Sequence, residues 1–431
     1  MAAAAPGRAA ASAFVGSAIE YYDFTLFATA SALFLGPVFF APLGPGADTL
    51  ASLATFGVAF LARPLGAVLF GHVGDQAGRR VALVATLVLM GVATFGIGLL
   101  PGYATIGVAA PVLLVALRLL QGLSAGAEQA GSNALTLEHA PEGRRGWYAA
   151  WTMQGTSVGT LLGKVAFLGI VAMPRDALLA WGWRVPFLVA GPLIAVAWII
   201  RARVSESPAF EPAQAPRVPA GEVLARHGRS VAIVACASLV ALGGAALNVY
   251  GLAYATTIKA MGSDTYLSVL IAMTAASLIA QPVWAALSDR YGRRRLFGSC
   301  ALAAAVLSFG FLGSIASRNL VAFVVATAVF TLAWSGANAV GAAFFCEQFP
   351  TRVRTTGTAL GTQLGMVLVG FGPTIMTALQ NPGATGWVAP AAFAAACLGV
   401  AALATRLAPE TADRSLALLG AGRAAELDRT H

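Results

Sequence analysis

Long apolar runs alternate with short polar breaks along the whole chain of 431 residues. Each run is long enough for a helix that crosses a bilayer, which takes roughly 20 mostly apolar residues at about 1.5 Å per residue. The pattern predicts an all-α membrane protein with twelve transmembrane helices, over residues 12–36, 50–72, 81–101, 107–137, 147–172, 183–203, 230–258, 265–288, 296–316, 320–347, 355–380 and 385–406.

The longest polar stretch separates the first six predicted helices from the last six. It covers residues 204–229 and is rich in proline, which disfavours helix and suits an extended linker. We therefore expect two six-helix halves, with an N-terminal half over 1–203, a linker over 204–229, a C-terminal half over 230–406 and a tail over 407–431.

A short polar motif supports this division because it occurs once in each half. It reads GHVGDQAGRR at residues 71–80, and a near copy, SDRYGRRR, follows at residues 288–295. Each copy contains an acid, a glycine three residues later and a basic cluster. Glycine permits a tight turn with positive φ, so both copies are expected to be turns between helices.

The composition excludes an ordinary soluble enzyme. Hydrophobic residues make up 58% of the chain and charged residues 10%, whereas soluble proteins carry about 25% charged residues. The histidines form no metalloprotease motif, no serine nucleophile elbow occurs, and the four cysteines lie singly in separate apolar runs. We therefore expect no enzymatic activity, no metal site and no cofactor.

The net charge of +9 is explained by membrane orientation. Most arginines fall in short loops on the side of the predicted bilayer that also holds both termini. Positively charged loops stay on the cytoplasmic side, so both termini are predicted to be cytoplasmic. Because the basic residues are scattered between apolar runs, we expect the lipid bilayer and no nucleic acid as their partner.

Two carboxylates lie three residues apart in the first predicted helix. Glu20 and Asp23 share a helix face, and a charge inside a bilayer marks a functional site unless it is paired or solvated. Desolvation and mutual repulsion favour protonation of one of the two. The pair is therefore predicted to carry a proton, with a structural pair neutralised by an arginine as the alternative.

Several further polar residues lie inside predicted helices of the N-terminal half. A buried guanidinium must meet a carboxylate, a carbonyl or an anionic substrate, so Arg63 and Arg118 serve either a substrate and proton site or a fixed ion pair. Lys164 could face a substrate carboxylate or the acidic pair, or else extend to the membrane surface. Gln121 and Glu128 share a face of the fourth helix, where Glu128 could pair with loop arginines.

The C-terminal half has fewer charges within its predicted helices and offers hydrogen-bonding and aromatic side chains instead. Such residues suit the second wall of a binding site, although tyrosine and tryptophan also favour membrane interfaces. The predicted substrate-binding set across both halves is Arg63, Arg118, Gln121, Gln154, Lys164, Asn248, Tyr250, Tyr254, Trp334, Asn338 and Gln363.

Motifs along the chain form a recognisable set. They read EYYDF at 20–24, FLARPLG at 60–66, RLLQG at 118–122, WGWRVPF at 181–187, ESPAF at 206–210 and EQFPTRVR at 347–354, in addition to the two loop copies. Together they resemble the metabolite:proton symporter branch of the major facilitator superfamily. The chain departs from that pattern where GAEQAG stands at 126–131 in place of GGEWGG, at Gln76, and at Lys164.

The resemblance implies a monomeric transporter in the bacterial inner (plasma) membrane that takes up a small metabolite with protons by alternating access. We expect an organic acid, such as a shikimate-like or di- or tricarboxylate anion. A zwitterion such as proline or betaine stays open, as does a proton-driven exporter of the same fold. The fifth predicted helix, however, lacks the Gly-Pro motif of drug exporters.

The loop copies and nearby charges are predicted to close the cytoplasmic side of the protein against neighbouring helices. This predicted gating set comprises Gly71, Asp75, Gly78, Arg79, Arg80, Glu128, Arg144, Asp289, Arg290, Gly292, Arg293, Arg294 and Glu347.

Overall fold

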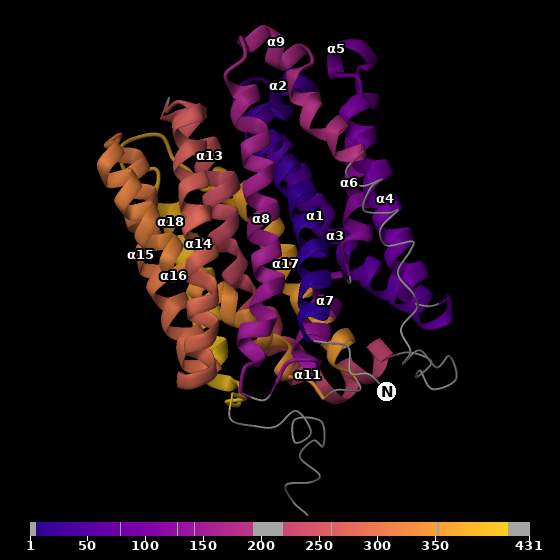
Figure 1. Ribbon diagram of the computed structural model, residues 1–431. Coiled ribbons are helices and arrows are strands. Elements are labelled where there is room, and N and C mark those ends of the chain that lie inside the picture. The colour runs from indigo at the N-terminus through magenta and orange to yellow at the C-terminus, as the bar shows by residue number, and fades with distance from the viewer. Residues whose placement is uncertain are drawn as a thin grey trace, which may run out of the picture.

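The computed structural model describes residues 6–77, 79–126, 128–141, 143–192, 219–259, 261–350 and 353–412. These residues are mostly helical and contain no strand, and the long helices run side by side in one bundle (Figure 1). The all-α architecture predicted from the apolar runs is confirmed.

Six helices, of which the fourth and fifth lie within one membrane-spanning run (Ala109–Glu138), form the N-terminal half together with helical residues 185–192. They are α1 (Pro6–Leu33), α3 (Ala47–Ala77), α4 (Arg79–Leu99), α6 (Ala109–Ser124), α7 (Glu128–Glu138) and α8 (Arg145–Val171). Short elements between them are α2 (Leu35–Phe39), η1 (Ala41–Leu43), α5 (Tyr103–Ile106), α9 (Arg175–Ala180) and η2 (Gly182–Arg184). Helices α2, α5 and α9 lie together at one end of the bundle (Figure 1).

The C-terminal half begins with a segmented helix. Its segments are α11 (Pro219–Ser238), η3 (Leu239–Ala241), α12 (Leu242–Ala245), η4 (Ala246–Tyr250), α13 (Gly251–Ala253) and η5 (Tyr254–Ile258), of which η4 and η5 are π-helical. Continuous helices follow, namely α14 (Ser263–Tyr291), α15 (Arg293–Ser317), α16 (Leu320–Glu347), α17 (Arg354–Ala378) and α18 (Val388–Leu407). Turns of π-helix are rare and frequently occur at functional sites.

Nine helical runs in the described residues are long and apolar enough to cross a bilayer. One of them, Val223–Thr257, combines the segments from α11 to η5. The other three predicted spans correspond to α1, to α4, whose apolar part is Val84–Leu99, and to the span at 183–203. Of this last span the structure describes helical residues 185–192, and residues 193–203 lie outside the described residues. The helices therefore agree with the twelve spans predicted from the sequence.

Several boundaries shift by a few residues, for example at the end of α3 (Ala77, predicted 72), and the largest described shift is at the start of the C-terminal half. Helix α11 begins at Pro219, inside the range predicted as linker. Proline fits the first turn of a helix because the amide hydrogen that it lacks would have no helical acceptor there. The backbone then leaves helical geometry at His227 (φ −121°, ψ 20°), so the first part of α11 is set off from the membrane helix that follows.

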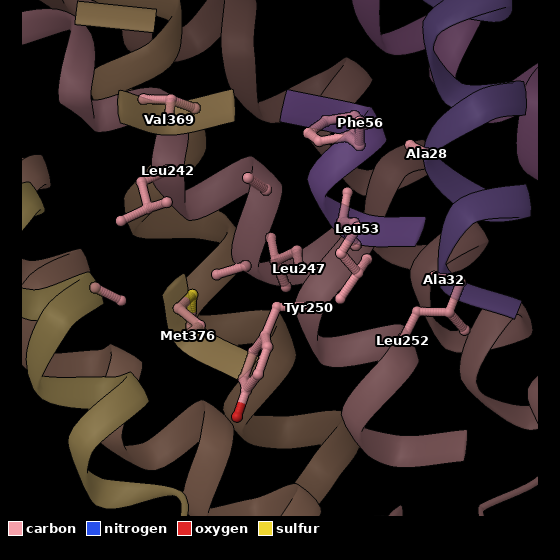
Figure 2. Packing of buried hydrophobic residues seen from close by; sticks show 14 of the residues in the cluster. Ala28, Ala32, Leu53, Phe56, Leu242, Leu247, Tyr250, Leu252, Val369 and Met376 are labelled. Carbon is pink, nitrogen blue, oxygen red and sulfur yellow. The ribbon is translucent and has the colours of Figure 1, made fainter. Parts of the chain in front are cut away.

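The two halves pack together along two main contacts. Helix α8 packs against α14 and α16, and α3 packs against α17. Figure 1 shows α4 and α6 on one flank of the bundle and α15 and α18 on the other. One hydrophobic cluster crosses the interface, and Figure 2 shows Ala32 and Leu53 of the N-terminal half with Leu247 and Leu252 of the C-terminal half within it.

Glycine allows α1 and α8 to approach each other closely. A Cβ atom at Gly155 or Gly159 would lie only 2.2 or 2.1 Å from a backbone oxygen of α1, far inside van der Waals contact. Any larger residue at these two positions would force the helices apart. The close contact fixes how α1, with Glu20 and Asp23, lies against α8, which carries Lys164.

Candidate functional site

A cavity lies at the interface between the two halves. Its solvent-accessible volume is about 120 Å³, and one water needs roughly 10–15 Å³ on this measure, so a small organic molecule fits. Its aromatic lining consists of Tyr21, Phe24, Phe56, Phe60 and Trp334. Its polar lining consists of Thr25, Thr156, Ser157, Thr160, Lys164, Asn248, Thr274, Ser277, Gln281, Thr331 and Asn338.

Lys164 is the only charged residue among the described side chains that line this cavity. It projects from α8, is 3% exposed, and donates a hydrogen bond from Nζ to Thr274 Oγ1 of α14 at 2.6 Å. Within the described part of the chain, no carboxylate forms an ion pair with it. Burying an unpaired charge costs free energy, so the wall around Lys164 favours an anionic group.

Three more residues of the predicted substrate-binding set, Asn248, Trp334 and Asn338, line the same cavity. The Trp334 indole is fixed because its Nε1 donates to the backbone oxygen of Val240 at 2.9 Å. Asn248 donates to the Gly244 oxygen at 2.8 Å, and its buried Oδ1 has no hydrogen-bond partner among the described residues. This oxygen can accept a hydrogen bond from a bound molecule.

Four other predicted binding residues lie outside the cavity lining. Gln154 and Gln363 connect the halves, through hydrogen bonds to Gln281 Oε1 (3.4 Å) and the Gly126 oxygen (3.1 Å) respectively. The rings of Tyr250 and Tyr254 stack on each other with centroids 5.7 Å apart, and the Tyr250 hydroxyl donates to Gln380 Oε1. Their contact with a substrate stays a prediction.

Asp23 lies in a polar network inside the N-terminal half. Its carboxylate accepts hydrogen bonds from Thr94 Oγ1 and from Gln121 Nε2, the latter at 3.1 and 3.2 Å to its two oxygens. Arg118 donates to Gln121 Oε1 at 2.7 Å, and its guanidinium carbon lies 3.8 Å from the Phe27 ring centroid. Arg118 and Gln121 thus support the carboxylate and do not line the central cavity.

Glu20 lies in the same region as Asp23 and pairs with a different arginine. Arg63 Nη2 is 3.8 Å from Glu20 Oε1, and both side chains are buried. Glu20, Asp23, Arg63, Arg118 and Gln121 together surround a second small space of about 10 Å³. The two carboxylates thus share one site, as their spacing predicted, but each has its own polar partners.

At one end of the bundle, α3 and α14 finish and α8 and α17 begin; we call this the arginine-rich end. Arg145 Nη1 lies 3.4 Å from Glu347 Oε1 of the other half, and Arg354 Nη1 lies 2.9 Å from Glu138 Oε1. These two ion pairs are reciprocal, because each half provides one arginine and one glutamate. They hold the halves together at this end.

Part of the predicted gating set belongs to this arrangement. Asp289 accepts hydrogen bonds from the backbone amides of Gly146 (3.0 Å) and Trp147 (3.1 Å) at the start of α8. Arg293, which is 1% exposed, contacts Asp289 at 2.6 Å and Glu347 at 3.3 Å. The motif at 288–295 therefore connects α14 and α15 to the opposite half.

Other members of the gating set lie around this core of contacts. Gly292 has φ of 96°, the conformation that glycine adopts most readily. Arg144 and Arg290 are exposed, Arg294 contributes a backbone amide to Glu410 Oε2, and Glu128 is buried at the start of α7. Gly78 lies outside the described residues, and only the backbone is described for Gly71, Asp75, Arg79 and Arg80.

Several residues that contribute to these sites were not predicted from the sequence, namely Thr94, Glu138, Arg145, Thr274, Arg354 and Glu410. A repeated pattern could have indicated Glu138, Arg145 and Arg354, because E-x-x-P-x-x-x-R occurs at 138–145 and again at 347–354. The repeated pattern places the acid and the arginine of both reciprocal pairs. Glu410 had no such signal, because its contact with α15 is far away in sequence.

These features define a multi-pass membrane transporter in which two helical halves enclose a central cavity. Residues 13–373 and 236–425 match the Major Facilitator Superfamily, and the chain belongs to this superfamily. The fold is the major facilitator fold, with twelve transmembrane helices in two six-helix halves.

Relatives with known names are transporters. The "Shikimate transporter" of Escherichia coli (strain K12) is 34% identical over 403 residues, which cover 91% of this chain and 92% of the relative. The "Proline/betaine transporter" of Salmonella typhimurium is 34% identical over 388 residues, covering 85% and 76%. Family and relatives together make this chain a secondary transporter of small metabolites.

Solved structures share the fold at lower sequence identity. The xylose transporter XylE from E. coli, in a partially occluded inward-open conformation, has a TM-score of 0.76 and 19% identity, covering 95% of this chain and 99% of that chain. The proton:xylose symporter XylE bound to 6-bromo-6-deoxy-D-glucose has a TM-score of 0.75 and 18% identity, covering 98% and 99%.

Proposed function

We propose that this chain is a symporter that takes up a small organic anion together with protons by alternating access. The observation that carries the proposal is Lys164, a buried ammonium on the cavity wall without a carboxylate partner in the described residues. A substrate carboxylate would supply the missing counter-charge. Thr274 Oγ1 already holds one ammonium hydrogen, which orients the group for such a contact.

The substrate class is supported from two directions. A relative whose alignment covers 91% of this chain is named for shikimate. Shikimate carries one carboxylate and several hydroxyls. The cavity offers Lys164 for the carboxylate and the buried Asn248 Oδ1 for a hydroxyl donor. We therefore place small hydroxylated or polycarboxylic acids first among the candidate substrates.

A zwitterionic substrate is the second candidate, and the aromatic wall favours it. Phe24, Phe56, Phe60 and Trp334 present rings to the cavity, and ring faces attract quaternary ammonium groups. A relative is named for proline and betaine. Measuring whether an organic acid or betaine inhibits the uptake more strongly separates the two candidates.

The proton site proposed here is the Glu20 and Asp23 region. Both carboxylates are buried away from the central cavity and have polar partners that can respond to a change in charge. In the two-half fold, rocking of the halves exposes the midplane to one side at a time. Protonation of Asp23 would weaken its hydrogen bonds to Gln121 and so change how α1, α4 and α6 hold together.

Orientation and assembly complete the proposal. The arginine-rich end is taken as cytoplasmic because positively charged loops remain on that side, which puts both termini in the cytoplasm of a bacterial inner membrane. We propose a monomer that imports its substrate and performs no enzymatic reaction.

Uptake into proteoliposomes tests this function. Labelled shikimate, citrate and betaine would be offered in turn, with and without an inward proton gradient. We expect accumulation of an organic acid that requires the gradient and collapses with a protonophore. Uptake that ignores the gradient and is unchanged in Asp23→Asn would contradict proton coupling, and substrate efflux driven by an inward proton gradient would contradict import by symport.

A further inference from the structure

Phe24 lies between the central cavity and the carboxylate site. Its ring lines the central cavity and also the small space around Glu20 and Asp23. It is the residue directly after Asp23 on α1, so a displacement of one moves the other through the same helix turn. No other described residue lines both spaces.

Two further rings complete an apolar layer at this position. The Phe24 centroid lies 5.0 Å from that of Phe56 and 5.5 Å from that of Phe60, and the Phe56 and Phe60 centroids are 5.5 Å apart. All three rings line the central cavity, and Figure 2 shows Phe56 on α3 beside Ala28 of α1. We call Phe24, Phe56 and Phe60 the phenylalanine layer.

Charged groups lie directly behind the phenylalanine layer. The guanidinium carbon of Arg63, which pairs with Glu20, lies 4.6 Å from the Phe60 centroid and 5.3 Å from the Phe24 centroid. Arg118 donates to the Phe56 backbone oxygen at 3.2 Å. The layer is therefore bound to both arginines of the proton site on one face and exposed to the substrate cavity on the other.

The phenylalanine layer also rests on the opposite half. A Cβ atom at Gly370 of α17 would lie 2.3 Å from a ring carbon of Phe60, so the ring packs directly on the α17 backbone. When the halves rock, α17 moves relative to α3 and the packing on Phe60 changes. The position of the layer thus depends on the conformation of the whole transporter.

We propose that the phenylalanine layer, with Phe24 as its key positioning residue, is the barrier that separates the proton site from substrate-cavity water and transmits substrate occupancy to Asp23. This inference rests on the proposed proton-coupled function. A layer of packed rings excludes water, and without water protons do not pass between the two spaces. A substrate pressed against Phe24 shifts Asp23 on the same turn and alters its contacts with Gln121.

Three variants test the proposal in proteoliposomes loaded without substrate and then with it. Phe24→Ala removes the ring, Phe24→Leu keeps an apolar side chain of similar reach, and Phe34→Ala removes a buried ring near the end of α1 that lines neither space. With the membrane potential clamped and a gradient of about one pH unit, one-proton uptake of a monoanion can reach roughly tenfold accumulation.

For Phe24→Ala we expect a substrate-independent proton leak and an accumulation that falls toward unity even where substrate exchange continues, because the barrier between the two spaces is lost. Phe24→Leu and Phe34→Ala should keep the accumulation and show no leak. Wild-type coupling and no leak in Phe24→Ala would overturn the proposal. So would a folded Phe24→Ala protein that loses exchange and shows no proton leak, because Phe24 would then act on substrate binding alone.

If Phe24→Ala fails to fold by thermal unfolding, Phe60→Ala decides by the same readouts, and tight coupling in that variant overturns the proposal. Failure of the proposed function itself is recognised separately. In that case wild-type uptake ignores the proton gradient, whatever the variants do.

Discussion

The central cavity and the carboxylate site both bury charge, but they do so in opposite ways. In the carboxylate site, Asp23 has Thr94 and Gln121, and Glu20 has Arg63. In the cavity, Lys164 has a neutral hydroxyl and no carboxylate partner within the described residues. The carboxylates therefore have polar partners within the protein, whereas the ammonium leaves room for the anionic ligand that we propose.

This difference matches the two tasks of the symport that we propose. A paired carboxylate can change its protonation while the fold supplies compensating contacts, and an unpaired cation selects the charge of what enters. The phenylalanine layer lies between the two sites, so each keeps its own surroundings. Variants in each site test whether the two sites differ in function as they do in geometry.

The largest effect is expected for Lys164→Gln. Loss of the ammonium removes the counter-charge of the bound carboxylate, and breaking a buried charge pair costs 2–5 kcal/mol, so uptake should fall by roughly 100-fold in kcat/KM. Lys259→Gln is the matched control, because Lys259 is the other lysine of the chain and lies outside the cavity lining. Similar kinetics in Lys164→Gln and Lys259→Gln would show that the cavity does not depend on the Lys164 charge, contrary to the comparison with the carboxylate site.

Asp23→Asn should abolish accumulation but leave exchange. An amide cannot carry the proton, so the roughly tenfold accumulation available from about one pH unit should disappear, while exchange of labelled for unlabelled substrate continues. Asp176→Asn in α9, outside the membrane helices, serves as the control. Gradient-driven accumulation in Asp23→Asn would show that a residue other than Asp23 carries the proton.

Glu347→Gln should slow transport through the conformational cycle. Its buried carboxylate contacts both Arg145 and Arg293, and removal of one partner of a buried ion pair is strongly destabilising. The closed arginine-rich end should become less populated, and the transport rate should fall roughly tenfold. Spin-label distances across the arginine-rich end measure the change in the closed population. An unchanged distance distribution would show that the Glu347 ion pairs do not hold this end closed.

Glu138→Gln should have the smallest effect, although it belongs to the reciprocal pair. The Arg354 side chain is buried, but the Glu138 side chain is 38% exposed, and ion pairs open to solvent contribute about 0.2–1 kcal/mol. We expect less than about a fivefold change in transport rate. An effect as large as that of Glu347→Gln would show that burial does not govern the strength of these contacts.

The sequence predicted the fold well because its signals were local. Apolar runs gave the helices, and the proline-rich break together with the repeated loop motif gave the division into two halves. The buried charges were also visible, since Glu20, Asp23 and Lys164 each interrupt an apolar run. Their roles could be told apart only by partners distant in the chain.

Partner choice depends on tertiary contacts that no local pattern encodes. Arg63, Arg118 and Lys164 were all predicted to bind substrate, yet the two arginines lie beside carboxylates and only Lys164 lines the cavity. Arg145 was overlooked beside Arg144 because neighbouring arginines differ only in which helix face they occupy. The E-x-x-P-x-x-x-R repeat would have selected Arg145 correctly.

Affinity for matched carboxylate and carboxamide ligands tests the central claim most directly. The acid that the protein transports and its neutral amide would compete with labelled substrate for wild type and for Lys164→Gln. If Lys164 is the counter-charge, wild type should prefer the acid by roughly 30-fold or more, and the variant should lose most of that preference. An equal preference for the acid in both proteins would contradict the assignment of Lys164.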